Sequence, residues 1–148
     1  MKTTISTILF VMVLGLVCNQ AWSCDSQQIP DNPWKLYVEN DNIQVYYRTI
    51  QCDYKDEGVR KEMVALKFVN KTEKKLVLEW DMQLFYNGIC RTCNLSGNEY
   101  HYTLTLEPSS VMEGNCGSEK ELLLFSKFII DKEMKGLSKF ELANMTIK

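Results

Sequence analysis

The sequence contains a single histidine and no concentration of charge of one sign. Its 17 Lys and Arg residues are balanced by 19 Asp and Glu residues, and the formal net charge is −2. Nucleic-acid binding depends on a concentrated positive surface, so the composition gives no support to a nucleic-acid partner. The G-x-S-x-G and H-E-x-x-H motifs of hydrolases and metalloproteases are also missing. We therefore expect a protein that is not an enzyme and does not bind nucleic acid.

Long apolar segments are equally scarce, and the one that exists lies near the N-terminus. Residues 8–18 form an unbroken apolar run behind Lys2, and Ala21-Trp22-Ser23 places small residues at the −3 and −1 positions of a cleavage site. The run is shorter than the roughly 20 residues of a transmembrane helix, and no later segment is apolar for longer. The pattern predicts a signal peptide over residues 1–23 and an exported protein, secreted or periplasmic.

The remaining chain of about 125 residues suits one domain with a substantial core. Residues 24–34 are rich in polar residues and contain Pro30 and Pro33, which predicts an exposed lead-in. No internal repeat or low-complexity segment divides the rest of the chain. Residues 35–148 are therefore expected to form a single domain.

Alternation of apolar and polar residues is the dominant pattern of this domain. Leu78, Trp80 and Met82 alternate with Glu79 and Asp81, which indicates a half-buried strand whose apolar face carries the tryptophan. No segment after the signal has a sustained i, i+3, i+4 apolar stripe. Similar runs, rich in β-branched and aromatic residues, give about seven predicted strands: 35–39, 43–49, 63–68, 76–86, 100–106, 122–130 and 140–147.

Short strands with short connections favour an antiparallel β-sandwich, immunoglobulin-like in architecture. The Cys…Trp…Cys spacing of immunoglobulin domains is missing, so the prediction concerns the architecture and not the family. A small closed β-barrel is the alternative. The runs at 63–68 and 76–86 are separated by a polar turn and are expected to pair as a hairpin.

Five cysteines remain after removal of the signal peptide, and export favours their oxidation. Cys24 follows the predicted cleavage site directly and is the odd one: it either carries a lipid, as in a bacterial lipoprotein, or is a free or intermolecularly paired thiol. Cys52, Cys90, Cys93 and Cys116 are the candidates for two disulfides, whose connectivity the sequence leaves open. A link from Cys90 or Cys93 to Cys116 fits the predicted strand order, because the two loops flank the strand at 100–106.

The motif Cys90-Arg91-Thr92-Cys93 also allows two functional interpretations. As a redox dithiol it lacks the helix N-terminus that would lower a thiol pKa, because it falls between strands. As a zinc site it would need Cys52 and Cys116 as further ligands, and these two are scattered singly. The sequence therefore favours structural disulfides, and no metal or cofactor is expected.

Catalytic candidates are few. His101 lies on the polar face of a predicted strand without a serine nucleophile motif nearby, and is interpreted as a solvated residue. Glu79 and Asp81 share one strand face. Paired carboxylates serve glycoside hydrolysis or calcium binding in other proteins, but outward-facing charges on a strand are usually just solvated.

Some aromatic residues and the three glycosylation sequons are further candidates for exposed positions. Tyr46 and Tyr47 are adjacent, so one of them faces outward; together with Trp34 they either contact a partner or cover the sandwich edge. The sequons matter only in a eukaryotic secretory pathway, and the first two fall in predicted turns where a glycan would be tolerated. They begin at Asn70, Asn94 and Asn144.

Several segments resemble small exported proteins of unknown function from Bacteroidota-type bacteria. These segments are Trp80–Leu84, the Cys90 and Cys93 pair, Glu99–Tyr102, Glu113–Cys116, Leu124–Lys127 and Lys139–Leu142. The resemblance implies an envelope or secreted location, and it carries no activity and no site residue.

The sequence thus predicts an exported, disulfide-stabilised β-sandwich that acts as a non-enzymatic binding or structural module of the cell envelope or extracellular space. Its loops would meet a protein or glycan partner, because a rigid sandwich leaves its connections free to vary. The alternative is a thiol-based protein that binds zinc or exchanges disulfides through Cys90 and Cys93.

Overall fold

The computed structural model describes residues 32–93, 95, 97–130 and 134–148. The predicted signal peptide, Cys24 and all but the last three residues of the predicted lead-in lie outside these ranges. Within them the fold is all-β, and no helix is long and apolar enough to cross a membrane.

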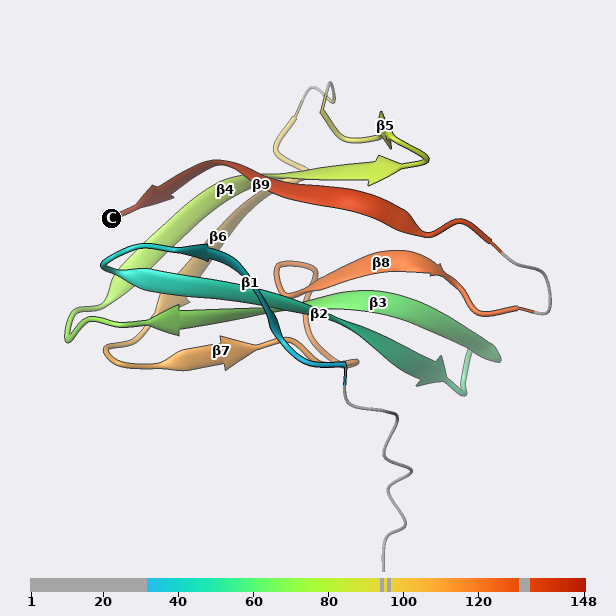
Figure 1. Cartoon of the computed structure of the whole chain (residues 1–148), viewed down its shortest axis with the longest axis horizontal. Coiled ribbons are helices and arrows are strands. Elements are labelled where there is room, and N and C mark those ends of the chain that lie inside the picture. Colours follow the sequence, from blue (N-terminus) through green and yellow to red (C-terminus); the bar gives the residue numbers. More distant parts are fainter. Residues whose placement is uncertain (1–31, 94, 96, 131–133) are drawn as a thin grey trace, which may run out of the picture.

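Two antiparallel sheets pack face to face in the described part of the chain (Figure 1). Sheet A contains β1 (Lys35–Glu39), β2 (Ile43–Tyr54), β3 (Val59–Asn70), β7 (Val111–Glu113) and β8 (Leu123–Phe128). Sheet B contains β4 (Leu76–Tyr86), β5 (Ile89–Cys90), β6 (His101–Leu106) and β9 (Leu137–Ile147). The predicted sandwich is confirmed, and the barrel alternative is wrong because the two sheets do not close into one.

The long strands β3 and β4 lie at the centre of their sheets. One edge of β3 pairs with β2 along its whole length, and β7 and β8 share the other edge. In the same way β9 lines one edge of β4, and β5 and β6 share the other. Each sheet therefore has a gap between two short strands on one edge. The sequence pattern did not predict β5 and β7, which are too short to show an alternation.

The predicted hairpin between 63–68 and 76–86 is wrong, because β3 and β4 belong to different sheets. The turn between them carries the chain from one sheet to the other, and both strands direct their apolar faces into one shared core. Alternation alone reports that a strand has one buried face, which is equally true of two strands paired in one sheet and of two strands facing each other.

Asn70 stabilises this crossing. Its side chain is 2% exposed, and its amide donates hydrogen bonds to the carbonyl oxygens of Lys74 at 2.7 Å and Glu107 at 2.9 Å. Its Oδ1 accepts from the backbone N–H of Thr72 at 2.9 Å. The acceptor asparagine of this sequon is therefore buried, contrary to the expectation of a turn that tolerates a glycan.

The core fills the space between the sheets. Trp80 is fully buried there with Leu78 and Met82, as the alternation predicts, and Glu79 and Asp81 lie on the outer face of sheet B. Apolar burial of this kind contributes about 25 cal/mol for each Å² removed from water.

A second, smaller cluster lies on the outer face of sheet A. Cys52, Met63 and Ala65 are buried in it, although they point away from the main core. The disulfide between Cys52 and Cys116, with Cα atoms 5.5 Å apart, holds the segment 115–121 at this face. That segment leaves the β3 edge at Gly114, whose backbone lies so close to Leu122 that an added Cβ would meet the Leu122 carbonyl oxygen at 2.2 Å.

Candidate binding pocket

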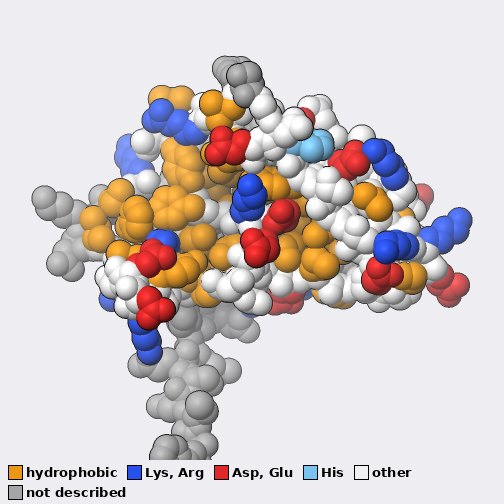
Figure 2. All heavy atoms as spheres, turned by 180° about the vertical axis from the view of Figure 1, so that it is seen from behind, with side chains coloured by type: hydrophobic (Ala, Val, Ile, Leu, Met, Phe, Trp, Pro, Cys, Tyr) orange, Lys and Arg blue, Asp and Glu red, His pale blue; other side chains and the backbone are white. Residues whose placement is uncertain are grey.

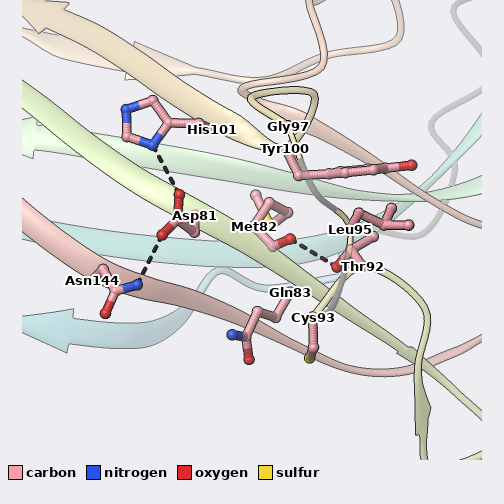
Figure 3. Close-up of a pocket in the computed structure, with 10 residues that line it drawn as sticks. All are labelled: Asp81, Met82, Gln83, Thr92, Cys93, Leu95, Gly97, Tyr100, His101 and Asn144. Atoms are coloured by element: carbon pink, nitrogen blue, oxygen red, sulfur yellow. Dashed lines mark hydrogen bonds and ion pairs between the residues drawn. The ribbon is translucent and has the colours of Figure 1, made fainter.

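A pocket of about 240 Å³ opens on the outer face of sheet B, beside the gap between β5 and β6 (Figure 3). Its polar wall is formed by side chains from neighbouring strands, and its other wall includes Tyr100 and the turn that follows Cys90. The polar residues are Asp81 and Gln83 of β4, His101 of β6 and Asn144 of β9.

Asp81 is the centre of a hydrogen-bonded chain across three strands. His101 Nδ1 lies 2.8 Å from Asp81 Oδ1, and Asn144 Nδ2 donates to Asp81 Oδ2 at 2.8 Å (Figure 3). The register explains this arrangement, since Asp81 stands opposite His101 on one side and Ala143 on the other. An ionised carboxylate only accepts hydrogen bonds, so His101 Nδ1 is the donor of its pair.

These hydrogen bonds favour the charged form of Asp81. The bond from Asn144 lowers the pKa of the Asp81 carboxyl most, and the bond from His101 lowers it further. Hydrogen bonds to an ionised group stabilise it relative to the protonated form. The Asp81 carboxyl is therefore ionised at neutral pH.

Asn144 reaches Asp81 from an irregular position in β9. Its φ is 54°, in the left-handed region that Asn tolerates better than most residues. The pairing of β4 with β9 shifts register between Glu79 and Asp81, next to this residue. Such irregularities re-aim a side chain and are common beside functional sites. The sequon at Asn144 is exposed but carries a side chain that is already hydrogen-bonded to Asp81.

Thr92 closes the gap in the sheet edge under the pocket. Its side chain is buried, and its hydroxyl donates to the Met82 carbonyl at 2.9 Å and accepts from the Leu84 N–H at 2.9 Å. On either side, the Arg91 N–H donates to Leu84 at 2.8 Å and the Met82 N–H donates to Tyr100 at 2.8 Å. The Thr92 hydroxyl therefore takes the place of a missing strand partner. Because it is engaged in these two hydrogen bonds, it is not available as a nucleophile.

The Cys90–Cys93 disulfide closes the turn that holds Thr92. The Cα atoms are 5.8 Å apart, and the Cys93 N–H donates to Cys90 Sγ at 3.0 Å. Cys93 is exposed and lines the pocket. The motif thus shapes the pocket wall through a structural bond.

The link from Cys90 or Cys93 to Cys116 that the strand order allowed is not formed. Cys116 lies with Cys52 on the outer face of sheet A, and the other pair lies at the edge of sheet B. The four-cysteine zinc site is therefore not assembled. Among the described residues no group of three or more His, Cys, Asp and Glu side chains is placed to hold a metal ion. Two disulfides in one small domain indicate an oxidising environment, extracellular or periplasmic.

The remaining sequence candidates do not join the pocket. Glu79 pairs with Lys148 at 2.7 Å instead of forming a carboxylate pair with Asp81. Trp34 lies over sheet A, where the Arg48 guanidinium and the Lys67 ammonium stack on its ring at 4.5 and 4.6 Å.

Sequence reasoning missed Gln83, Tyr100 and Asn144 as parts of one site. The available signal was Asn144, a residue depleted in strands, within an otherwise regular run.

A second hollow lies on the open side of the sandwich, between β8 and the edge of sheet B. It measures about 420 Å³ and is lined mainly by apolar and aromatic side chains; Figure 2 shows hydrophobic side chains gathered on this face of the molecule. Tyr86 crosses it and donates from its hydroxyl to the Phe125 carbonyl at 2.6 Å. Burial raises the pKa of Tyr86. This hydrogen bond therefore links sheet B to sheet A.

No protein-family model matches the chain, and no curated protein or solved structure is detectably similar to it. The function therefore has to be inferred from the chemistry of the pocket.

Proposed function

We propose that this protein is an exported, non-enzymatic binding module of the cell envelope or extracellular space, and that it binds its partner at the pocket on sheet B. The observation that carries the proposal is the hydrogen-bonded chain His101–Asp81–Asn144. Three neighbouring strands of sheet B hold these side chains, and the two nitrogen–oxygen distances to the Asp81 carboxylate are both 2.8 Å. Rigid elements hold a recognition site more precisely than loops do.

The same chemistry argues against catalysis. Among the described residues that line the pocket, Thr92 and Cys93 are those of the Ser, Thr and Cys type that a hydrolytic triad uses as its nucleophile. The Thr92 hydroxyl is used in the sheet edge, and the Cys93 sulfur is in a disulfide. An Asp–His pair without a nucleophile in reach lacks the third member of a hydrolytic triad. Binding is the role that remains for a pocket of this composition.

Export is supported by the disulfides and by the apolar run of residues 8–18 with its cleavage-site pattern. The full chain should be expressed from Met1 in a bacterium with a C-terminal tag. We expect the protein outside the cytoplasm, with an intact mass that lacks residues 1–23 and with Cys24 at its N-terminus. A mass excess on Cys24 would show the lipoprotein form. A full-length, reduced protein in the cytoplasm would overturn the proposal.

Binding at the pocket can be tested in the same cells with a photo-crosslinking amino acid at Gln83. Gln51 is the matched control, since it is a glutamine on sheet A, exposed and remote from the pocket. We expect a crosslinked product from position 83 and none from position 51. Equal products from both positions, or none from either, would contradict a partner at this pocket.

Disulfide exchange through Cys90 and Cys93 is a second candidate, favoured by the exposure of Cys93. The described residues around this pair contain no helix whose N-terminus would lower a thiol pKa. A reduction potential within the range of known dithiol oxidoreductases, about −120 to −270 mV, would favour this role. A potential below about −300 mV, typical of structural disulfides, would exclude it.

A further inference from the structure

The second hollow, between β8 and the β5–β6 edge of sheet B, extends into the space between the sheets. Its walls include Met82 and Leu124, which are 1% and 4% exposed and belong to the main core. Its volume of about 420 Å³ lies within the roughly 300–1,000 Å³ of small-molecule sites. Figure 2 shows hydrophobic side chains gathered on this face of the molecule. The flat surface of a folded partner would reach only the rim of such a space, whereas a narrow apolar chain can enter it.

The wall of this hollow presents no unpaired backbone group at the gap in sheet B. The gap lies at Met82 and Leu84, whose N–H groups donate to the Tyr100 carbonyl at 2.8 Å and to the Thr92 hydroxyl at 2.9 Å. Their carbonyl oxygens accept from the Thr92 hydroxyl at 2.9 Å and from the Arg91 N–H at 2.8 Å. A peptide that added a strand here would therefore find no free hydrogen-bonding partner. The wall instead favours a ligand that removes apolar surface from water.

Positive charges lie at the mouth of the second hollow. Among the described residues that line it, the charged ones are Arg91, Lys120 and Glu99, all exposed, so two cations are set against one carboxylate. The Lys120 ammonium lies 5.5 Å from the centre of the Tyr102 ring. Neither cation forms an ion pair with a described residue, and Glu121, the other acid near Tyr102, does not line the hollow. Both cations are thus available to an anionic group.

Two phenolic hydroxyl groups add hydrogen-bond donors to this region. Tyr100 and Tyr102 line the hollow, and neither hydroxyl is hydrogen-bonded to another described residue. Burial raises the pKa of Tyr102, and the neighbouring Tyr100, Glu121 and Glu99 raise it further, so this hydroxyl is protonated at neutral pH. A carboxylate accepts hydrogen bonds from phenols and ammonium groups, and arginine binds it with two parallel N–H groups.

A ligand that uses both parts of the site has one unbranched hydrocarbon chain with a carboxylate at its end. We propose that the second hollow binds a free fatty acid, with the chain between the sheets and the carboxylate at Arg91 and Lys120. The hollow lies on the inner side of sheet B, and Asp81 lies on its outer side. The inference therefore names a further site and does not rest on the proposed function.

The test uses the exported protein with both disulfides intact, stripped of co-purified lipid on a hydrophobic resin. It is titrated in a calorimeter with laurate, dodecanol and dodecyltrimethylammonium, which share one chain length and differ in the charge of the head group. A laurate analogue with a diazirine in its chain is also crosslinked to the wild-type protein, and the labelled peptides are mapped by mass spectrometry.

The variants separate the head group from the chain. Arg91→Gln combined with Lys120→Gln removes the two cations at the mouth. Lys74→Gln is the matched control, an exposed lysine in the turn between β3 and β4 that does not line the hollow. All three positions are exposed, so the fold should be kept, and thermal melting of each variant checks this.

We expect laurate to bind about tenfold or more tightly than dodecanol, because hydrogen bonds to charged groups are the strong ones. Dodecyltrimethylammonium should bind most weakly, and laurate binding should show the negative heat-capacity change of apolar burial. In the double variant the laurate affinity should fall to that of dodecanol, and Lys74→Gln should match wild type. The crosslinks should fall within residues 82–86 and 123–125.

Absence of laurate binding, equal affinities of the wild type for laurate and dodecanol, or crosslinks confined to other segments would overturn the fatty-acid site. A laurate affinity that falls equally in Lys74→Gln would also overturn the assignment of Arg91 and Lys120 as the carboxylate partners. A partner crosslinked from position 83 without any laurate binding would overturn this site and leave the proposed function intact.

Discussion

The rings of Phe68 and Trp80 stack with their centroids 5.3 Å apart, and they belong to opposite sheets. This contact joins β3 to β4 through the middle of the sandwich. Both side chains are fully buried. The two strands, consecutive in sequence, thus meet through their side chains and not through backbone hydrogen bonds.

Trp80→Ala should therefore destabilise the protein strongly. The substitution leaves a cavity between the sheets and should reduce the free energy of unfolding by about 3–5 kcal/mol. Glu79→Ala is the control on the outer face of the same strand, where an exposed ion pair with Lys148 is worth about 1 kcal/mol or less. Urea melts of both variants measure the difference. Similar losses in the two would mean that Trp80 is not a core residue.

The buried side chain of Asn70 gives a second test of how the chain crosses between sheets. Asn70→Ala leaves the carbonyls of Lys74 and Glu107 without their donor. Each buried polar group left unsatisfied costs about 1–3 kcal/mol, so a loss in that range or somewhat above it is expected. Asn42→Ala changes an exposed asparagine and should lie within about 0.5 kcal/mol of wild type. Chemical denaturation measures both, and a neutral Asn70→Ala would show that the crossing does not depend on this side chain.

The strand pattern of the sequence predicted most of the fold, because most strands bury one apolar face in the core between the sheets; β3 also buries Met63 and Ala65 on its outer face. The run from Leu76 to Tyr86 matches β4 at both ends. Pairing was not predictable from the same pattern: alternation shows which side of β3 and β4 is apolar, but not whether the strands lie side by side or face to face. The disulfide connectivity was not predictable for a similar reason. Cys116 reaches Cys52 only because the segment after Gly114 folds back over sheet A.

The pocket was harder to predict than the fold. Asp81 and His101 were both identified as outward-facing strand residues, and that assignment is correct. Their contact depends on β6 and β9 flanking β4 in one register, which no local pattern records. Long-range pairing is set by the packing of the whole domain, so a site assembled from three strands becomes visible only with the structure.

Asn144 should control the ionisation of Asp81. Because the hydrogen bond from Asn144 lowers the Asp81 pKa most, Asn144→Gly is expected to raise that pKa toward its ordinary value near 3.9. Carbonyl-detected NMR titration of the aspartate side chains measures the shift. Thr146→Ala, an exposed change on the same strand, serves as control and should leave the Asp81 pKa unchanged.

The ionisation of Asp81 makes the free energy of unfolding depend on pH in a defined direction. A carboxyl whose folded-state pKa is depressed contributes stability above its unfolded pKa and loses it as the pH falls through the folded value. The stability difference between wild type and Asn144→Gly should therefore be largest near neutral pH and shrink below about pH 4. Asp81 is partly exposed, so the contribution is small, about 1 kcal/mol or less. A difference that grows on acidification would contradict this assignment.

Thr92 offers a test of the gap in sheet B. Thr92→Val keeps the shape of the side chain but removes the hydroxyl that bonds to Met82 and Leu84. Leaving these backbone groups without partners should cost about 1–3 kcal/mol. Thr103→Val, at an exposed position of β6, makes the same chemical change where no such bond exists. We expect no loss there, and hydrogen exchange at the Leu84 amide should accelerate in Thr92→Val alone.

The two disulfides should differ in their contribution to stability. Cys52 and Cys116 are separated by 64 positions, and Cys90 and Cys93 by 3. In the chain-entropy model the longer loop stabilises by about 4 kcal/mol and the short one by about 2 kcal/mol, because the first restricts far more of the unfolded chain. The double variant Cys52→Ala with Cys116→Ala should therefore melt at a lower urea concentration than Cys90→Ala with Cys93→Ala.

The short disulfide should instead act on the pocket. Its removal frees the turn that holds Thr92 and Cys93 at the pocket wall, so ligand binding should fall more than global stability does. The variant lacking Cys52 and Cys116 should show the reverse, a large loss of stability with the pocket intact below its melting point. Urea melts combined with crosslinking from position 83 separate the two effects. Equal behaviour of the two double variants in both measurements would mean that the Cys90–Cys93 bond has no special relation to the pocket.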